Sequence, residues 1–147
     1  MGKCFARGFF IHLAGGCEYL LHEINIVQNL RLGAGEVKPR AVRDKLSKHG
    51  KSSPAFDYWK AQRDDSGSFL TLLCELRNAG THRYYLNKVI YASSHSRPDN
   101  EVIDPRTKQS QQLYPGLGVI SLMESLLKEA QDFIATCHHQ LDVNAHI

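Results

Sequence analysis

The hydrophobic residues of this chain recur at gaps of three and four in three long segments, which is the spacing of one face of an α-helix. These segments cover residues 8–31, 68–91 and 117–141. The first carries apolar residues at Phe10, Leu13, Cys17, Leu20, Ile24 and Val27. The last has the clearest pattern, with Val119, Met123, Leu126, Ala130, Phe133, Cys137 and Leu141. No segment of useful length alternates as a strand does, so the pattern predicts helices throughout.

Turn-forming residues mark where these helices should begin and end. Residues 33–35, Gly-Ala-Gly, should end the first helix near residue 32. Pro39 is suited to the first turn of a short helix that Gly50 ends, and Ser53-Pro54 reads as an N-cap followed by a first-turn proline. Ser68 can cap the second long segment in the same way.

Residues 93–116 are polar and contain prolines at positions 98 and 105, with a third at 115, which predicts a long loop before the last helix. At 147 residues, one hydrophobic core is the default. The sequence therefore predicts a single all-α domain over residues 1–147. We expect an up-down bundle of four to five helices.

The composition, 42% hydrophobic and 22% charged, is typical of a water-soluble globule. His12 interrupts the apolar run near the N-terminus, which is too short for a signal core or a membrane span. The four cysteines, Cys4, Cys17, Cys74 and Cys137, include no Cys-x-x-Cys pair, and this argues against zinc. We therefore expect reduced thiols in a cytoplasmic protein that has no contact with membranes.

Positive charge is concentrated between residues 38 and 51. The stretch has a single acid, Asp44, and six cations, namely Lys38, Arg40, Arg43, Lys45, Lys48 and Lys51. Such a run can neutralise phosphates and make RNA binding depend steeply on salt. It can equally be the solvated face of a helix, and the net charge of +3 is too small to decide between the two.

Three other features resemble known sites but do not have the required pattern. Gly50-Lys51-Ser52 matches the end of a phosphate-binding P-loop, but Lys45 stands where that pattern requires glycine. His138 and His139 are neighbours on a helix, where side chains point about 100° apart and cannot chelate one ion together. The aromatic residues around Trp59 are able to stack bases, but their helical spacing is more typical of a core. The sequence therefore predicts neither a metal nor a cofactor.

The strongest chemical signal is the segment Arg77-Asn78-Ala79-Gly80-Thr81-His82. On a regular helix Arg77 and His82 would lie roughly 140° apart, so they can share a face only if the helix is broken between them. Gly80-Thr81 is where such a break is easiest. The residues alone leave another interpretation open, in which Arg77 caps a neighbouring helix and His82 is a satisfied core residue.

Residues 76–83, Leu-Arg-Asn-Ala-Gly-Thr-His-Arg, resemble the signature of the HEPN superfamily, in which an arginine and a polar residue precede a histidine. Here four residues separate Arg77 from His82, and the polar residue is Asn78. The predicted bundle is also similar to that family's architecture, although the specific likeness is confined to these eight residues.

This resemblance implies a metal-independent endoribonuclease that attacks RNA through its 2′-hydroxyl, with two motifs facing each other across a homodimer cleft. It implies that Arg77 and His82 are catalytic, that Asn78 supports them and that Arg83 contacts RNA. His82 can move a proton near neutral pH, and Arg77 can stabilise charge on the phosphate. Many HEPN domains are inactive, so the alternative is a nucleotide- or RNA-binding module, or a toxin–antitoxin protein with an antitoxin or nucleotidyltransferase partner.

Overall fold

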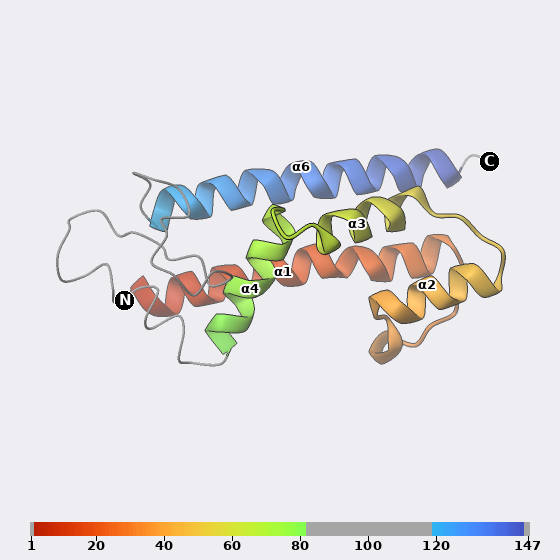
Figure 1. Cartoon of the computed structure of the whole chain (residues 1–147), viewed down its shortest axis with the longest axis horizontal. Coiled ribbons are helices and arrows are strands. Elements are labelled where there is room, and N and C mark those ends of the chain that lie inside the picture. The colour runs from red at the N-terminus through yellow and green to blue at the C-terminus, as the bar shows by residue number, and fades with distance from the viewer. Residues whose placement is uncertain (1, 82–118, 146–147) are drawn as a thin grey trace.

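The computed structural model describes residues 2–81 and 119–145, which form five α-helices and one short 3₁₀ helix and contain no strand (Figure 1). The elements are α1 (Gly2–Val27), η1 (Ala34–Glu36), α2 (Pro39–Lys48), α3 (Pro54–Asp64), α4 (Phe69–Thr81) and α6 (Val119–Ala145). The predicted all-α bundle is confirmed. The loop expected over residues 93–116 and the helical pattern expected over 82–91 lie outside the described residues.

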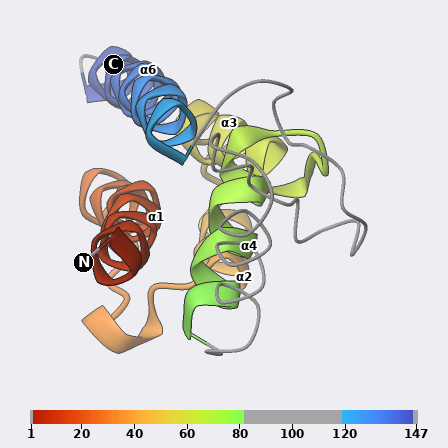
Figure 2. The same ribbon diagram turned by 90° about the vertical axis from the view of Figure 1, so that its left-hand side faces the viewer.

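Helix α1 is the centre of the bundle, since it packs against α4 and α6 and also contacts α2 and α3. α6 runs beside α1 in the same direction, and α3 runs the opposite way (Figure 1). α4 crosses the N-terminal half of α1 at an angle, and the end-on view in Figure 2 shows α3 and α4 together on one side of α1 and α6.

The apolar positions predicted for the last helix face the core wherever their side chains are described. Each described position in that pattern is buried, namely Met123, Leu126, Ala130, Phe133, Cys137 and Leu141. The first helix follows its pattern less closely, because Leu13 is half-buried and Val27 is 45% exposed. In the described part of the chain, no helix has the length and apolar content that crossing a membrane requires.

Val27 is exposed because α1 ends there, several residues before the predicted end near residue 32. Asn29 adopts a left-handed backbone conformation, with φ of 49°, and the amide of Leu30 donates to the carbonyl oxygen of Asn25 at 2.9 Å. This is the hydrogen bond of a Schellman helix cap. The side chain of Asn25 then holds the outgoing chain through two hydrogen bonds to the backbone of Leu32, at 3.0 and 3.1 Å.

The boundaries predicted at Pro39, Gly50, Pro54 and Ser68 are confirmed, whereas α1 begins at Gly2, earlier than the predicted residue 8. Pro39 and Pro54 occupy the first turns of α2 and α3. The hydroxyl oxygen of Ser53 accepts a hydrogen bond of 3.3 Å from a first-turn amide of α3, and that of Ser68 accepts one of 3.1 Å at the start of α4. Gly50 ends α2 with φ of 60°, a conformation that glycine adopts at little cost.

Candidate functional site

The arginine of the predicted motif lies near the end of α4, where it is turned toward α1. Its NH1 nitrogen is 2.6 Å from Oε1 of Glu18 on α1, and the two side chains are 23% and 42% exposed. The side-chain oxygen of Asn78 accepts hydrogen bonds from Nε and NH2 of Arg77, both at 3.3 Å. The guanidinium group is therefore held between two partners and does not extend freely into solvent.

The electrostatic setting of Arg77 favours its charged form. The hydrogen bond that Arg77 donates to Glu18 raises the pKa of Arg77 above its ordinary value, and the negative charge of Glu18 acts in the same direction. Partial burial opposes this rise without cancelling it. A permanently cationic fork with fixed donors is suited to binding a phosphate or to stabilising charge on one.

The break predicted at Gly80-Thr81 does not occur within α4, which stays α-helical through both residues. A glycine inside a helix costs only about 1 kcal/mol relative to alanine, and buried residues of α4 such as Leu73 and Leu76 stabilise this helix through packing. His82 and Arg83 lie outside the described residues. The pairing of Arg77 with His82 therefore remains a prediction.

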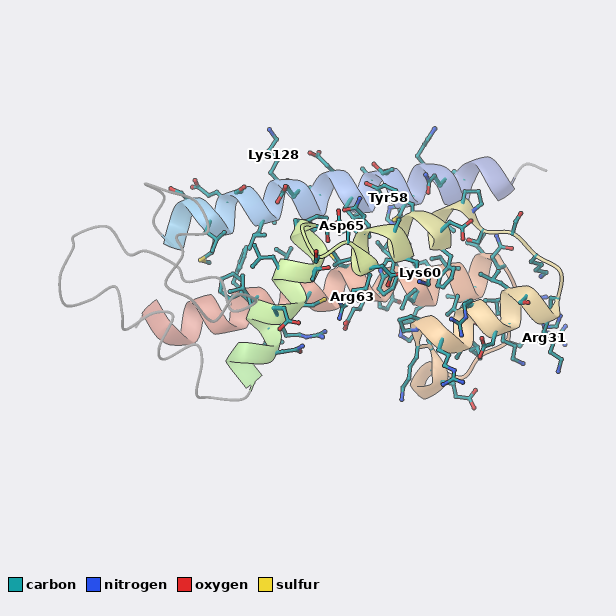
Figure 3. All side chains as sticks on the ribbon, viewed as in Figure 1. Arg31, Tyr58, Lys60, Arg63, Asp65 and Lys128 are labelled. Carbon is teal, nitrogen blue, oxygen red and sulfur yellow. The ribbon has the colours of Figure 1, made fainter. Side chains whose placement is uncertain are left out.

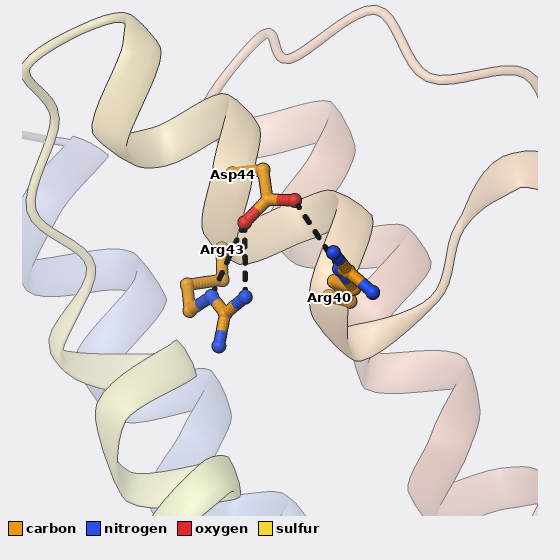
Figure 4. Close-up of polar contacts among 3 residues, drawn as sticks. All are labelled: Arg40, Arg43 and Asp44. Atoms are coloured by element: carbon orange, nitrogen blue, oxygen red, sulfur yellow. Dashed lines mark hydrogen bonds and ion pairs between the residues drawn. The ribbon is translucent and has the colours of Figure 1, made fainter.

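The basic stretch forms the outer surface of α2, whose inner side is anchored by the buried residues Val42 and Leu46. Two of its cations share one carboxylate. Arg40 lies 3.8 Å from Asp44, and Arg43 binds the same group through Nε and NH2 at 3.2 and 3.1 Å (Figure 4). This partial neutralisation was not evident from the count of charges.

The remaining cations of the stretch are spread along the same end of the bundle. Lys48 is exposed and Lys45 is half-buried, while the ammonium group of Lys51 donates to a backbone carbonyl oxygen after α1. α2 packs on α1 toward the end opposite the tip of α4 (Figure 1). The structure thus brings only the first residue of the stretch, Lys38, close to the surroundings of Arg77.

Lys38 lines a cavity of about 390 Å³ between α1, the start of α2 and α3. Glu18 lines the same cavity and pairs with Arg77, so the cavity adjoins the motif. Three of its other residues, Tyr19, His22 and Arg63, were not singled out by sequence reasoning. Tyr19 and His22 are three residues apart on α1, which puts them on one helix face, but no sequence motif connects them with Arg63.

The aromatic residues around Trp59 belong to the core, as predicted. Trp59 is 2% exposed, and its indole nitrogen donates to the carbonyl oxygen of Cys17 at 2.9 Å. Tyr58 stacks on Phe133 with ring centroids 5.5 Å apart.

Three cysteines, Cys17, Cys74 and Cys137, are buried and free, in agreement with the expectation of reduced packing thiols. Burial raises the pKa of Cys17 and of Cys137 to about 12, and raises that of Cys74 in the same direction. Such thiols remain protonated near neutral pH and are poor nucleophiles. Among the described residues, no three His, Cys, Asp or Glu side chains are grouped so that they could hold a metal ion.

Comparisons of the chain with models of protein families, with curated proteins and with solved structures found no match. The interpretation of the site therefore depends on the residues themselves: the motif from Arg77 to His82, the held guanidinium group and the cavity beside it.

Proposed function

We propose that this protein is an endoribonuclease that cleaves RNA by attack of a ribose 2′-hydroxyl and needs no metal ion. Arg77 and His82 would be its catalytic residues, and Asn78 would position the guanidinium group of Arg77. The observation that best supports this proposal is the placement of Arg77, which is partly buried, permanently charged and fixed by Glu18 and Asn78. Preorganised charge of this kind stabilises a transition state at little reorganisation cost.

The proposed reaction is a transesterification. The O2′ atom attacks the adjacent phosphorus, the bond from phosphorus to O5′ breaks, and the products are a 2′,3′-cyclic phosphate and a free 5′-hydroxyl. His82 accepts the 2′-hydroxyl proton or supplies the proton that the leaving O5′ takes up, which is the usual role of histidine in acid–base catalysis. Arg77 binds the nonbridging oxygens as negative charge accumulates on them. The nucleophile is already part of the substrate, which lowers the entropic cost of attack.

A homodimer is part of this proposal, because it would place two such motifs at one cleft. Several apolar side chains are exposed on the single chain, including Ile26 at 70% on α1 and Leu127 at 40% on α6. Burying such residues favours association. Sedimentation equilibrium at tens of micromolar protein should give twice the mass of the chain, and a monomer there would contradict a composite site.

The proposal is tested by incubating the purified protein with mixed RNA and with DNA of the same sequences, in the presence and absence of a chelator. RNA should be cut to fragments ending in 2′,3′-cyclic phosphate, which mass spectrometry identifies. Chelator should not change the rate, and DNA should stay intact because it lacks the 2′-hydroxyl.

Substitutions of His82 and Arg77 test the catalytic roles proposed for these two residues. His82→Ala should lower the rate by about 10²–10⁴-fold, as loss of a general acid or base does. Arg77→Ala should lower it by about 10²–10³-fold through lost charge stabilisation. Lys128→Ala, on the exposed face of α6, is the control and should cleave like the wild type. Circular dichroism and melting check that each variant is folded, and a folded His82→Ala variant with the wild-type rate would remove His82 from the mechanism.

The second candidate function is a non-catalytic module that binds RNA or nucleotide. The ion pair between Arg77 and Glu18 favours it, since the pair already engages part of the guanidinium group that a substrate would need. A protein that binds RNA or nucleotide but does not cleave RNA would support this second function.

A further inference from the structure

The cavity between α1, the start of α2 and α3 contains two cations available to an anion. Lys38 is exposed at the N-cap of α2. Arg63, which Figure 3 labels, is half-buried near the end of α3. Within residues 2–81 and 119–145, neither forms an ion pair with a carboxylate, whereas Lys60, one turn before Arg63, pairs with Asp64. Within these residues, the positive charges of Lys38 and Arg63 are therefore not neutralised by an ion pair.

The one carboxylate that lines the cavity, that of Glu18, is paired with Arg77 outside it. Its charge is therefore largely compensated from the side of α4. The N-terminus of the ten-residue helix α2 adds to the positive potential, because Lys38 and Pro39 border the cavity and the side chain of Lys38 does not cap the first-turn amides. Cations and a helix N-terminus at one cavity favour phosphate.

The α1 wall of the cavity is aromatic. The rings of Tyr19 and His22 are stacked, with centroids 5.4 Å apart and planes inclined by 20°. Tyr19 is 58% exposed, so part of its aromatic surface is open to solvent. An exposed ring face beside cations is the combination on which nucleobases stack in proteins that bind single strands.

The size of the cavity fits this chemistry. A volume of about 390 Å³ falls within the range of sites for small organic ligands and exceeds what a single phosphate ion fills. We propose that this cavity binds one nucleotide unit, with its phosphate on Lys38 and Arg63 and its base on the Tyr19–His22 stack. The unit is either a free nucleotide or one residue of an RNA strand.

The proposal rests on the proposed function in one respect, namely that an RNA strand is the substrate at Arg77. Glu18 forms the wall shared by the cavity and the Arg77 site, so a strand that leaves the cavity on that side reaches the guanidinium group. In this arrangement the cavity holds a nucleotide adjacent to the cleaved bond and supplies affinity, not chemistry.

Isothermal titration calorimetry tests the site with adenosine 5′-monophosphate and with a 2′-O-methyl RNA hexamer, which cannot be cleaved through a 2′-hydroxyl. Adenosine and inorganic phosphate are the two half-ligands. Tighter binding of the hexamer than of the nucleotide identifies an RNA strand as the source of the ligand, and the reverse order identifies a free nucleotide. No saturable binding of either would overturn the proposal.

Matched variants locate the binding. Arg63→Gln and Lys38→Gln should each weaken nucleotide binding about tenfold, as expected for the loss of one charge-assisted hydrogen bond. Tyr19→Ala should weaken binding of the nucleotide and leave the affinity for inorganic phosphate unchanged. Lys60→Gln, on the same helix as Arg63 but outside the cavity, should bind like the wild type.

The test of nucleotide binding in the cavity is independent of whether the protein cleaves RNA. If the wild type cuts RNA while Arg63→Gln binds nucleotide with unchanged affinity, the proposed nucleotide site is wrong and the proposed ribonuclease function is not affected. If nucleotide binding depends on Lys38 and Arg63 but no RNA is cut, the proposed ribonuclease function is wrong and the nucleotide site in the cavity is supported. Melting temperatures of all variants should lie close to that of the wild type, because all four side chains concerned are exposed or only half-buried.

Discussion

Arg77 on α4 and Glu18 on α1 are joined by an ion pair of 2.6 Å, although 59 positions separate them in the sequence. The pair fixes the guanidinium group of the predicted motif against the central helix of the bundle. Because Glu18 also lines the cavity beside Lys38 and Arg63, it links the two parts of the candidate site. A change at Glu18 should therefore affect Arg77 directly.

A double-mutant cycle measures this link. Glu18→Gln, Arg77→Gln and the double variant should give a coupling energy of about 0.5–1 kcal/mol, since the carboxylate is 42% exposed and solvent screens the pair. Urea denaturation followed by the fluorescence of Trp59, the single buried tryptophan, reports the free energy of unfolding of each variant. Additive effects of the two substitutions would show that the ion pair contributes no stability.

The fold could be predicted largely because helix boundaries in this chain depend on local chemistry. The caps at Ser53 and Ser68 and the left-handed turn at Gly50 are each a single residue with a strong preference. The predicted end of α1 near residue 32 is too late because Asn29, and not a glycine, takes the left-handed position after Val27. Asparagine adopts that conformation less often, so its signal is weaker.

The candidate site was only partly predictable. The motif from Arg77 to His82 is continuous in sequence and can be recognised without a structure. The ion pair with Glu18 and the cavity with Arg63 depend on how α4 and α3 pack on α1, and no local pattern encodes that packing. Likewise, the sequence shows Asp44 as the single acid among six cations, but only the structure shows that both Arg40 and Arg43 contact it.

The shared carboxylate on α2 gives a prediction for RNA binding. Asp44→Asn removes the acid that Arg40 and Arg43 both contact, so it should strengthen RNA binding and make its salt dependence steeper. Replacing Arg40, Arg43 and Lys48 together should have the opposite effect on both quantities. Asp57→Asn, an exposed acid in the first turn of α3, is the control and should change affinity less. Unchanged salt slopes in all variants would assign the stretch to a solvated face.

Two glycines should respond to alanine with opposite sign. Gly16 lies within α1 and is exposed, and an added Cβ would meet no atom within 4 Å. Gly16→Ala should therefore stabilise the protein by about 0.5–1 kcal/mol through helix propensity. Gly50→Ala should destabilise it by about 1–2 kcal/mol, because φ of 60° disfavours a Cβ even in open space. Melting of both variants tests this, and destabilisation by Gly16→Ala would place that face in a close contact, such as a homodimer interface.

The buried thiols predict how stability depends on pH in the alkaline range. Burial raises the pKa of Cys17 and Cys137 from 9.0 to about 12 in the folded state. Above pH 9 the unfolded chain loses these protons while the folded chain retains them, so the unfolded state is favoured as the pH rises. Each thiol should thus lower the free energy of unfolding by about 1.4 kcal/mol per pH unit between pH 9 and 12, with no effect below pH 9.

The comparison that isolates this effect is between the wild type and a Cys17→Ala/Cys137→Ala variant. The cavities left by the two substitutions lower stability by the same amount at every pH, whereas the thiol contribution changes with pH. The wild type should therefore lose stability faster than the variant as the pH rises from 8 to 10.5, and the other titrating groups cancel in the difference. Parallel stability curves would mean that the two thiols ionise as readily in the folded state as in the unfolded chain. A thiol-reactive dye gives a second readout, since at pH 8 it should label Cys17 and Cys137 only as fast as the protein unfolds.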